Sequence, residues 1–164
     1  MADELTIRPA RDEDLDALLP LYKHLVPEDP PLDRSEAAAI LKRLSRYPGS
    51  AVLVGVHGDI VAATCTLIIV PNLTRGGTPF ALIENVVTDP EHRNRGFGKA
   101  IVEDALRIAW DHDCYKVMLL TGTNNPATLA FYHDIGFEQT KRGFQIRRIP
   151  PTADERDPIR PIGE

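Results

Sequence analysis

The sequence is poor in groups that would bind metal or cross a membrane. It has only two cysteines, Cys65 and Cys114, and no cysteine or histidine cluster at metal-ligand spacing. We therefore predict no metal site and two reduced, structural thiols. No apolar run reaches the roughly 18 residues of a membrane-spanning helix, and the acidic residues 1–10 lack the apolar core of a signal peptide. A cytoplasmic protein that binds no membrane is expected.

Net charge and chain length bear on the possible partners and on the number of domains. The formal net charge of −5 at pH 7 disfavours binding to nucleic acid or to an anionic membrane. A chain of 164 residues with 43% hydrophobic residues is enough for one sizeable core. Its last residues are rich in proline and charge, which is typical of an extended or disordered segment. We predict one domain over residues 1–149 and a tail over residues 150–164.

Apolar periodicity and turn residues predict the order of elements. Strands are expected over residues 5–9, 51–56, 60–70, 80–88, 116–120 and 145–149. Helices are expected over residues 12–25, 35–46, 98–111 and 126–135, with Asp12 capping the first and Pro20 kinking it. The order β-α-α-β-β-β-α-β-α-β predicts an α/β (α+β) fold, a mixed sheet with helices on both faces.

The segment over residues 86–99 joins a strand to a helix through a basic, glycine-containing loop. A Walker A loop would need glycine where Arg93 stands, and a Rossmann fingerprint would need it at Ile101. Gly96 and Gly98 still permit tight dihedral angles and close approach of an anion. The helix N-terminus adds about half a positive charge. The segment is either an anion site or a plain strand-to-helix turn.

Two motifs in this half of the chain resemble one enzyme superfamily. Arg93-x-x-Gly96-x-Gly98, preceded by a V-V-x-D-P strand end, resembles the R/Q-x-x-G-x-G/A signature of the GNAT acetyltransferases. Further on, Asn125, Phe131-Tyr132 and Gly136-Phe137 resemble the N…FY…GF segment of the same superfamily. The resemblance implies a splayed GNAT-type sheet, an N-acetyltransferase activity and acetyl-CoA as the co-substrate.

The resemblance also implies which residues hold the co-substrate. The pyrophosphate would be cradled, mostly by backbone N–H groups, in the loop of Arg93, Asn94, Arg95, Gly96, Phe97, Gly98 and Lys99. The pantetheine arm would lie along the end of the preceding strand, at Val86, Val87 and Thr88, where one N–H would polarise the acetyl carbonyl. Asn125 and Tyr132 complete the implied cofactor-binding set. The sheet would splay between residues 80–88 and 116–120 to admit the arm.

Two side chains are candidates for proton transfer. Tyr132 matches the superfamily tyrosine that protonates the leaving thiolate; the alternative is a core aromatic residue on a short helix. Glu84 is the candidate general base, because a carboxylate in an apolar strand is costly without a purpose. Strand alternation could instead place Glu84 on a solvated face, with Asn85 on the opposite one. His92 and His133 are expected to be solvated and to take no part.

A narrower likeness bears on the acceptor. Residues 114–117, Phe131-Tyr132 and residues 145–148 resemble parts of eukaryotic glucosamine-6-phosphate N-acetyltransferases, with Asn85 in place of an aspartate. Arg147 then matches an arginine that helps hold a phosphate, and Glu84 is a second candidate for substrate binding. The alternative for Lys141, Arg142, Arg147 and Arg148 is a solvated edge strand that binds no substrate, in which Arg147 and Arg148 point to opposite faces.

Three functions stay open at this point. The first is acetylation of the primary amine of a small molecule, an amino-sugar phosphate being the most specific candidate. The second is acetylation of a protein or peptide, and the third is a non-catalytic module that binds acyl-CoA. A homodimer is implied by the resemblance alone.

Overall fold

The computed structural model of the protein describes residues 4–121 and 125–149. The chain divides into two compact units, Met1–Leu119 and Leu120–Glu164, and each is described by itself. The tail expected over residues 150–164 lies outside the described residues. The single domain over residues 1–149 and its tail therefore stay predictions.

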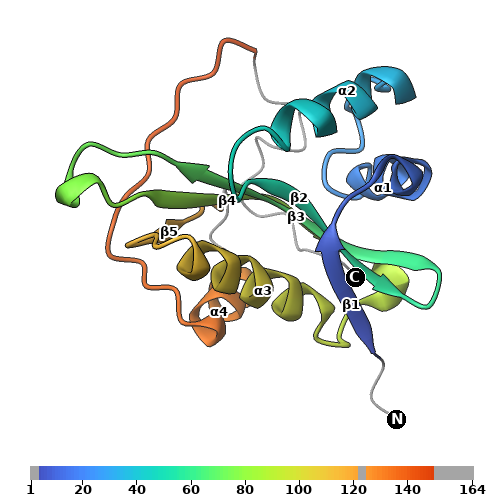
Figure 1. The fold of residues 1–164 in the computed structure, drawn as a ribbon. Coiled ribbons are helices and arrows are strands. Elements are labelled where there is room, and N and C mark those ends of the chain that lie inside the picture. The colour runs from blue at the N-terminus through green and yellow to red at the C-terminus, as the bar shows by residue number, and fades with distance from the viewer. Residues whose placement is uncertain (1–3, 122–124, 150–164) are drawn as a thin grey trace. The chain divides into compact units, whose positions relative to one another are not determined.

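The first unit is built on a five-stranded sheet in the order β1-β2-β3-β4-β5 (Figure 1). The first three neighbouring pairs are antiparallel, and β4 and β5 are parallel. The mixed sheet predicted from the sequence is confirmed. The strands are β1 (Leu5–Pro9), β2 (Ala51–His57), β3 (Ile60–Val70), β4 (Phe80–Thr88) and β5 (Val117–Met118).

Helices cover both faces of this sheet, as the sequence predicted. Figure 1 shows α1 (Leu15–Tyr22) and α2 (Arg34–Leu44) on one face and α3 (Phe97–Asp111) on the other. The second unit contains α4 (Pro126–Ile135). Among residues 4–121 and 125–149, no helix combines the length and the apolar character needed to cross a membrane.

The start of α1 differs from the prediction that Asp12 caps it. Asp12 lies in a short 3-10 turn, and the buried Asp14 accepts hydrogen bonds instead. Its carboxylate binds Arg8 Nη1 at 2.7 Å, Arg8 Nη2 at 2.8 Å and the Arg11 backbone N at 2.6 Å. The Arg8 hydrogen bonds lower the pKa of Asp14, although burial opposes this shift. The pair ties the start of α1 to β1.

The core on the α3 side of the sheet is closely filled. The Cys65 thiol lies 3.9 Å from the Ile101 carbonyl oxygen, which places Cys65 on this side. Leu53 opposes Cys65 across the β2–β3 ladder, so it shares that face. Leu53, Cys65 and Ile101 are each 0% exposed. We call this side the α3 face and the opposite side the α1–α2 face.

The strand expected over residues 145–149 is not present. Within the described part of the chain, residues 137–149 contain no helix or strand, and the side chains from Glu138 to Ile149 are exposed. Phe144 is 93% and Ile146 100% exposed. A strand needs a hydrogen-bonded neighbour, and no described strand pairs with this segment. The argument that alternation separates Arg147 from Arg148 therefore fails.

Candidate functional site

The strand β4 is paired on both sides over only part of its length. Its β5 partners are limited to Ala81 with Val117 and Leu82 with Met118. From Ile83 to Thr88, no strand of the described residues pairs with β4 on that side, while β3 continues to pair with it on the other. This is the splay expected from the sequence, and it leaves backbone N–H and C=O groups along one edge of β4 for another partner.

A β-bulge interrupts β4 at the start of this open half. Glu84 pairs with Thr66 and Val87 with Thr64, so two residues of β4 oppose the single residue Cys65. Asn85 has a φ of 53°, a left-handed conformation that asparagine tolerates better than most residues. Because Thr64 and Thr66 share a face, Glu84 and Val87 share it too, although they are three residues apart.

The bulge corrects one expectation about side-chain direction. Asn85 was expected on the face opposite Glu84, but it lines a cavity on the α1–α2 face together with Thr66, the ladder partner of Glu84. Glu84 itself is exposed. The cost of burying a carboxylate therefore no longer supports Glu84 as the base, and its role in proton transfer stays a prediction.

A hydrogen-bonded turn follows β4. The Asp89 carboxylate accepts from the Glu91 backbone N at 2.9 Å and binds His92 Nδ1 at 3.0 Å. Burial opposes ionisation of Asp89, but these hydrogen bonds outweigh it and lower the pKa of its carboxyl group. His92 is buried, with its ring stacked 6.3 Å from that of Phe97. The expectation of a solvated His92 is wrong, because the ring lies against the first residue of α3.

The loop between His92 and α3 is exposed and sharply turned. Arg93, Asn94, Arg95 and Gly96 are all exposed, and Asn94 and Gly96 have φ angles of 60° and 80°. The first bond of α3 runs from the Ala100 N–H to the Gly96 carbonyl oxygen at 2.9 Å.

The N–H groups at the start of α3 are thus outside its internal hydrogen-bond pattern. These belong to Phe97, Gly98 and Lys99, at the positive end of the helix dipole. Gly98 was expected to supply a special backbone angle, but it lies inside α3 and has no positive φ. Gly96 takes that part as the residue that caps the helix. The loop has the donors and the field that an anion needs.

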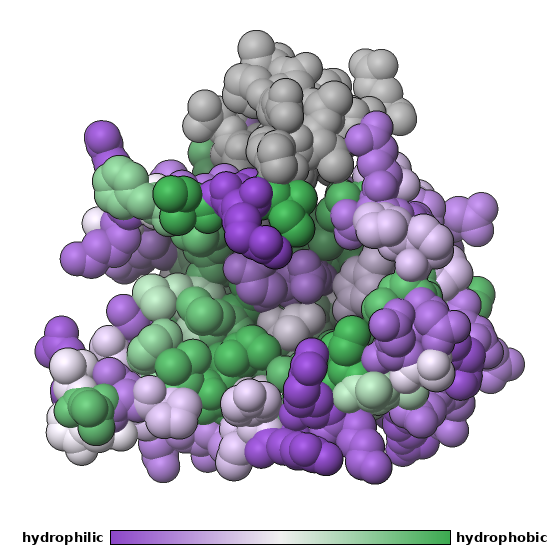
Figure 2. All heavy atoms as spheres, turned by 90° about the horizontal axis from the view of Figure 1, so that it is seen from above, coloured by the Kyte–Doolittle hydropathy of each residue, from purple (hydrophilic) through white to green (hydrophobic). Residues whose placement is uncertain are grey.

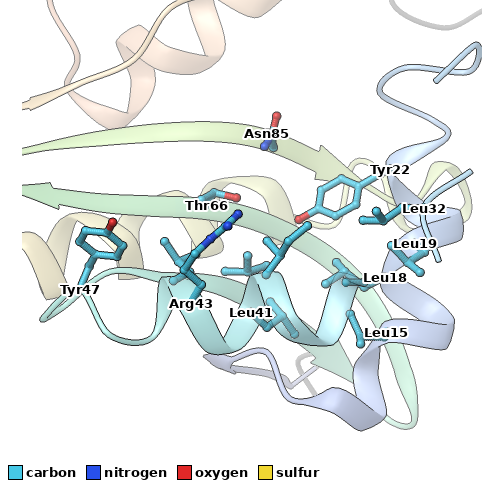
Figure 3. Close-up of a pocket in the computed structure, with 14 residues that line it drawn as sticks. Leu15, Leu18, Leu19, Tyr22, Leu32, Leu41, Arg43, Tyr47, Thr66 and Asn85 are labelled. Carbon is cyan, nitrogen blue, oxygen red and sulfur yellow. The ribbon is translucent and has the colours of Figure 1, made fainter. Parts of the chain in front are cut away.

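A cavity of about 370 Å³ lies on the α1–α2 face (Figure 3). Figure 2, which views the molecule from this side, shows hydrophobic side chains gathered together and surrounded by hydrophilic ones. The fourteen residues that line the cavity come from α1, α2, the loops beside them and the sheet. They are Leu15, Leu18, Leu19, Tyr22, Leu32, Ala37, Ile40, Leu41, Arg43, Leu44, Tyr47, Val52, Thr66 and Asn85.

The polar groups of the cavity are few and lie at defined points. Burial raises the pKa of Tyr22 above its usual value, and the nearby Thr64 and Thr66 hydroxyl groups oppose this shift. Figure 3 shows Arg43 extending from α2 toward Thr66. Sequence reasoning did not identify Arg43 or Tyr22. The spacing of Ile40 and Arg43, three residues apart, could have placed Arg43 on the edge of α2 that Ile40 occupies.

In the second unit, the motif residues lie on and beside α4. The Asn125 side chain caps α4 by accepting from the Ala127 backbone N at 2.9 Å. The half-buried Tyr132 has its ring 5.0 Å from that of Phe131 and 5.8 Å from that of Phe137. Gly136, with φ of 107°, ends the helix so that the Phe137 N–H donates to the Tyr132 carbonyl oxygen at 3.0 Å. Arg147 is exposed in the irregular segment at residues 137–149.

No group of three or more histidine, cysteine or carboxylate side chains suited to a metal ion occurs in the described ranges 4–121 and 125–149. Within the first unit, β4 and the loop after it carry Glu84, residues 86–88 and residues 93–99 in one continuous stretch. Tyr132, Asn125 and Arg147 belong to the second unit.

Comparison with known proteins agrees with this arrangement. Residues 16–137 match the acetyltransferase (GNAT) family. The chain is 36% identical over 146 residues to a glucosamine 6-phosphate N-acetyltransferase of Trypanosoma brucei brucei, covering 87% of this chain and 95% of that protein.

Two solved structures are similar over most of their length. One is from Agrobacterium tumefaciens str. C58, with a TM-score of 0.82 and 48% identity, covering 87% of this chain and 99% of that one. The other is a Trypanosoma brucei acetyltransferase, with a TM-score of 0.78 and 34% identity, covering 88% of this chain and 99% of that one. On these matches and on its fold, the chain belongs to the GNAT family of acetyltransferases.

Proposed function

We propose that the protein is an acetyl-CoA-dependent N-acetyltransferase that acts on the primary amine of a small molecule. The observation that carries the proposal is the close succession along the chain of two sets of backbone groups that the described sheet and helices leave unpaired, one at the open edge of β4 and one at the start of α3. The open edge of β4 ends at Thr88, the turn of Asp89 and His92 comes next, and the exposed loop leads to the free N–H groups of α3. A long ligand with a thioester at one end and a pyrophosphate further along suits such a strip.

In this proposal the two parts of the strip bind different parts of acetyl-CoA. The loop of Arg93–Lys99 holds the pyrophosphate through backbone N–H groups, with the exposed Arg93 and Arg95 adding positive charge. The open edge at Val86, Val87 and Thr88 pairs with the pantetheine arm as an additional strand would. One N–H there polarises the acetyl carbonyl, and Asn125 is a further cofactor contact.

The reaction is a direct attack of the neutral amine on the thioester. The amine nitrogen forms a bond to the acetyl carbon, and the carbon–sulfur bond breaks with its electron pair leaving on sulfur. Tyr132 gives its hydroxyl proton to that sulfur and is reprotonated from solvent. Its ordinary pKa of about 10 exceeds the roughly 8.5 of a thiol, so the transfer requires close approach to the thiolate. The proton lost by the nitrogen goes to Glu84, directly or through water.

The amine is proposed to carry an anionic group, and an amino-sugar phosphate is the first acceptor to test. The Trypanosoma relative is named for glucosamine 6-phosphate. Residues 141–148 of this chain include Lys141, Arg142, Arg147 and Arg148, and arginine binds phosphate oxygens with two parallel hydrogen bonds. Acetylation of a protein or peptide, or a non-catalytic acyl-CoA-binding role, are the alternatives. The homodimer and the cytoplasmic location stay predictions.

The test measures release of free thiol from acetyl-CoA with a panel of small amines, peptides and a no-amine control. We expect turnover with small amines and not with peptides. Tyr132→Phe should lower kcat by about 10- to 1000-fold and change the KM for acetyl-CoA little. Tyr115→Phe, at an exposed tyrosine of the first unit, is the matched control and should leave kcat unchanged. Full turnover of Tyr132→Phe with every amine would assign Tyr132 a structural role only.

A further inference from the structure

The cavity on the α1–α2 face restricts what the acceptor can be. It reaches β4 at Asn85, directly beside Glu84, so an amine bound in it lies next to the strand that holds the thioester in the proposed function. Its volume of about 370 Å³ is at the lower end of the roughly 300–1,000 Å³ of small-molecule sites. The role of this cavity as the acceptor site rests on the proposed function, because it requires the thioester to lie along β4.

The walls of this cavity are largely aliphatic. Nine of the fourteen lining residues are leucine, isoleucine, valine or alanine, and the polar ones are Tyr22, Arg43, Tyr47, Thr66 and Asn85. The Thr66 hydroxyl lies close enough to Tyr22 to act on the pKa of that tyrosine. Every ligand hydroxyl that leaves water for an aliphatic wall without a partner costs about 1–3 kcal/mol. The lining thus favours a ligand whose central part is hydrocarbon over one rich in hydroxyl groups.

Arg43 is the one charged side chain among the residues that line the cavity. It projects from α2 toward Thr66 (Figure 3). Within residues 4–121 and 125–149, no carboxylate forms an ion pair with it. The planar fork of a guanidinium group matches either a carboxylate or a phosphate and binds it through two parallel hydrogen bonds.

We infer that the acceptor is a primary amine joined by an apolar body to an anionic group, and that Arg43 binds that group. The amine then lies toward Asn85 and Glu84 on β4, the anion lies where the Arg43 side chain approaches Thr66 on β3, and the hydrocarbon that joins them contacts the aliphatic walls. This acceptor keeps the amine and the anion of the proposed function, has hydrocarbon in place of the sugar ring that joins them, and binds its anion at Arg43 in place of Arg147. Arg43 determines specificity and takes no part in the chemistry.

The test compares matched acceptors that differ in one feature at a time. A series of straight-chain ω-amino carboxylates and aminoalkyl phosphates is compared with alkylamines of equal length and with glucosamine 6-phosphate. We expect one chain length with an anion to give the highest kcat/KM. The two anion types show whether a carboxylate or a phosphate is preferred, and glucosamine 6-phosphate tests the cost of hydroxyl groups.

Variants at Arg43 identify the anion contact. Arg43→Met should raise the KM for the best anionic acceptor by about 10- to 100-fold, and leave the alkylamine and acetyl-CoA values unchanged. Arg43→Lys, which keeps the charge and loses the fork, should fall between. Lys42→Met removes an exposed neighbouring cation that does not line the cavity, and it should change none of these values.

Two results would overturn the inference while leaving the acetyltransferase intact. One is a higher kcat/KM for glucosamine 6-phosphate than for every hydrocarbon acceptor, and the other is an equal effect of Arg43→Met on charged and uncharged amines. Absence of thiol release with all amines would reject the proposed function itself, and the inference with it. Because Arg43 is exposed, its variants are expected to fold, and an unchanged KM for acetyl-CoA verifies this.

Discussion

The two faces of the sheet use similar aliphatic side chains but are covered to different degrees. On the α3 face, Leu53, Leu67 and Ile101 are each 0% exposed, and the helix lies directly on the strands. On the α1–α2 face, Leu18 and Val54 are as well buried, yet α2 stands far enough away to leave a cavity of about 370 Å³. Both faces bury apolar side chains that stabilise the fold, and the α1–α2 face also leaves room for a ligand. Substitutions of similar size should therefore have different effects on the two faces.

Ile101→Ala on the α3 face should cause the largest loss of stability. Its side chain is 0% exposed, so truncation loses apolar burial and leaves a void, at a cost of about 2–5 kcal/mol. The free energy of unfolding from urea titration, with the m-value unchanged, measures it.

The matched control for this prediction is Leu41→Ala on the α1–α2 face. Leu41 is half-buried and already borders the cavity, so its truncation should cost about 1 kcal/mol. Equal losses from Ile101→Ala and Leu41→Ala would show that the two faces contribute alike and would remove the distinction.

Asp14→Asn should weaken the attachment of α1 to β1. Hydrogen bonds from Arg8 lower the pKa of Asp14 below its unfolded value of about 3.9. The stability it contributes is therefore present at neutral pH and is lost as the pH falls through the lower, folded-state pKa. At pH 7 we expect a loss of about 1–3 kcal/mol, which becomes smaller in acid.

Unfolding titrations at pH 7 and at pH 3 measure this change. Asp16→Asn, at an exposed carboxylate that pairs with Arg34 at 3.0 Å, is the control and should change little at either pH. An Asp14→Asn protein with the acid sensitivity of the parent would contradict the assignment.

Gly96→Val should have the smallest effect on stability and a selective effect on acetyl-CoA. Gly96 has φ of 80°, and a Cβ there would meet no atom within 4 Å, so strain in the backbone is the main consequence. Moving the loop to relieve it should raise the KM for acetyl-CoA on the order of tenfold. Gly76→Val has the same open surroundings and a φ of 69°, but lies between β3 and β4. A KM raised equally by both variants would place the anion site elsewhere.

Short-range sequence patterns predicted most of the strands and helices. The strands at residues 5–9, 60–70 and 80–88 and the helix at residues 126–135 have the expected bounds, because alternation, capping residues and turns act within a few residues. The family was identified from Arg93, Gly96 and Gly98 in their strand-to-helix context.

Features that depend on tertiary contacts could not be predicted from the sequence. His92 reads as a loop residue in the sequence, and its burial depends on Phe97 and His57. The cavity and Arg43 depend on how α2 stands relative to the sheet. The segment at residues 145–149 has the composition of a strand, but composition does not supply the neighbour that a strand requires.

The bulge at Asn85 determines which residues of β4 face the cavity. One additional residue lets Glu84 and Val87 face the same way across an odd separation, so the apolar pattern remains in phase on both sides of the site. Deleting Asn85 would remove the bulge and leave Glu84 opposite Thr66 and Val87 opposite Thr64, so the two faces of the strand would be unchanged on either side of it. Val87 would stay in the cluster formed with Leu18 and Leu21, and the left-handed residue that lines the cavity would be lost. Among related chains, a one-residue gap in this strand should therefore fall at the bulge, because a gap elsewhere would exchange its two faces.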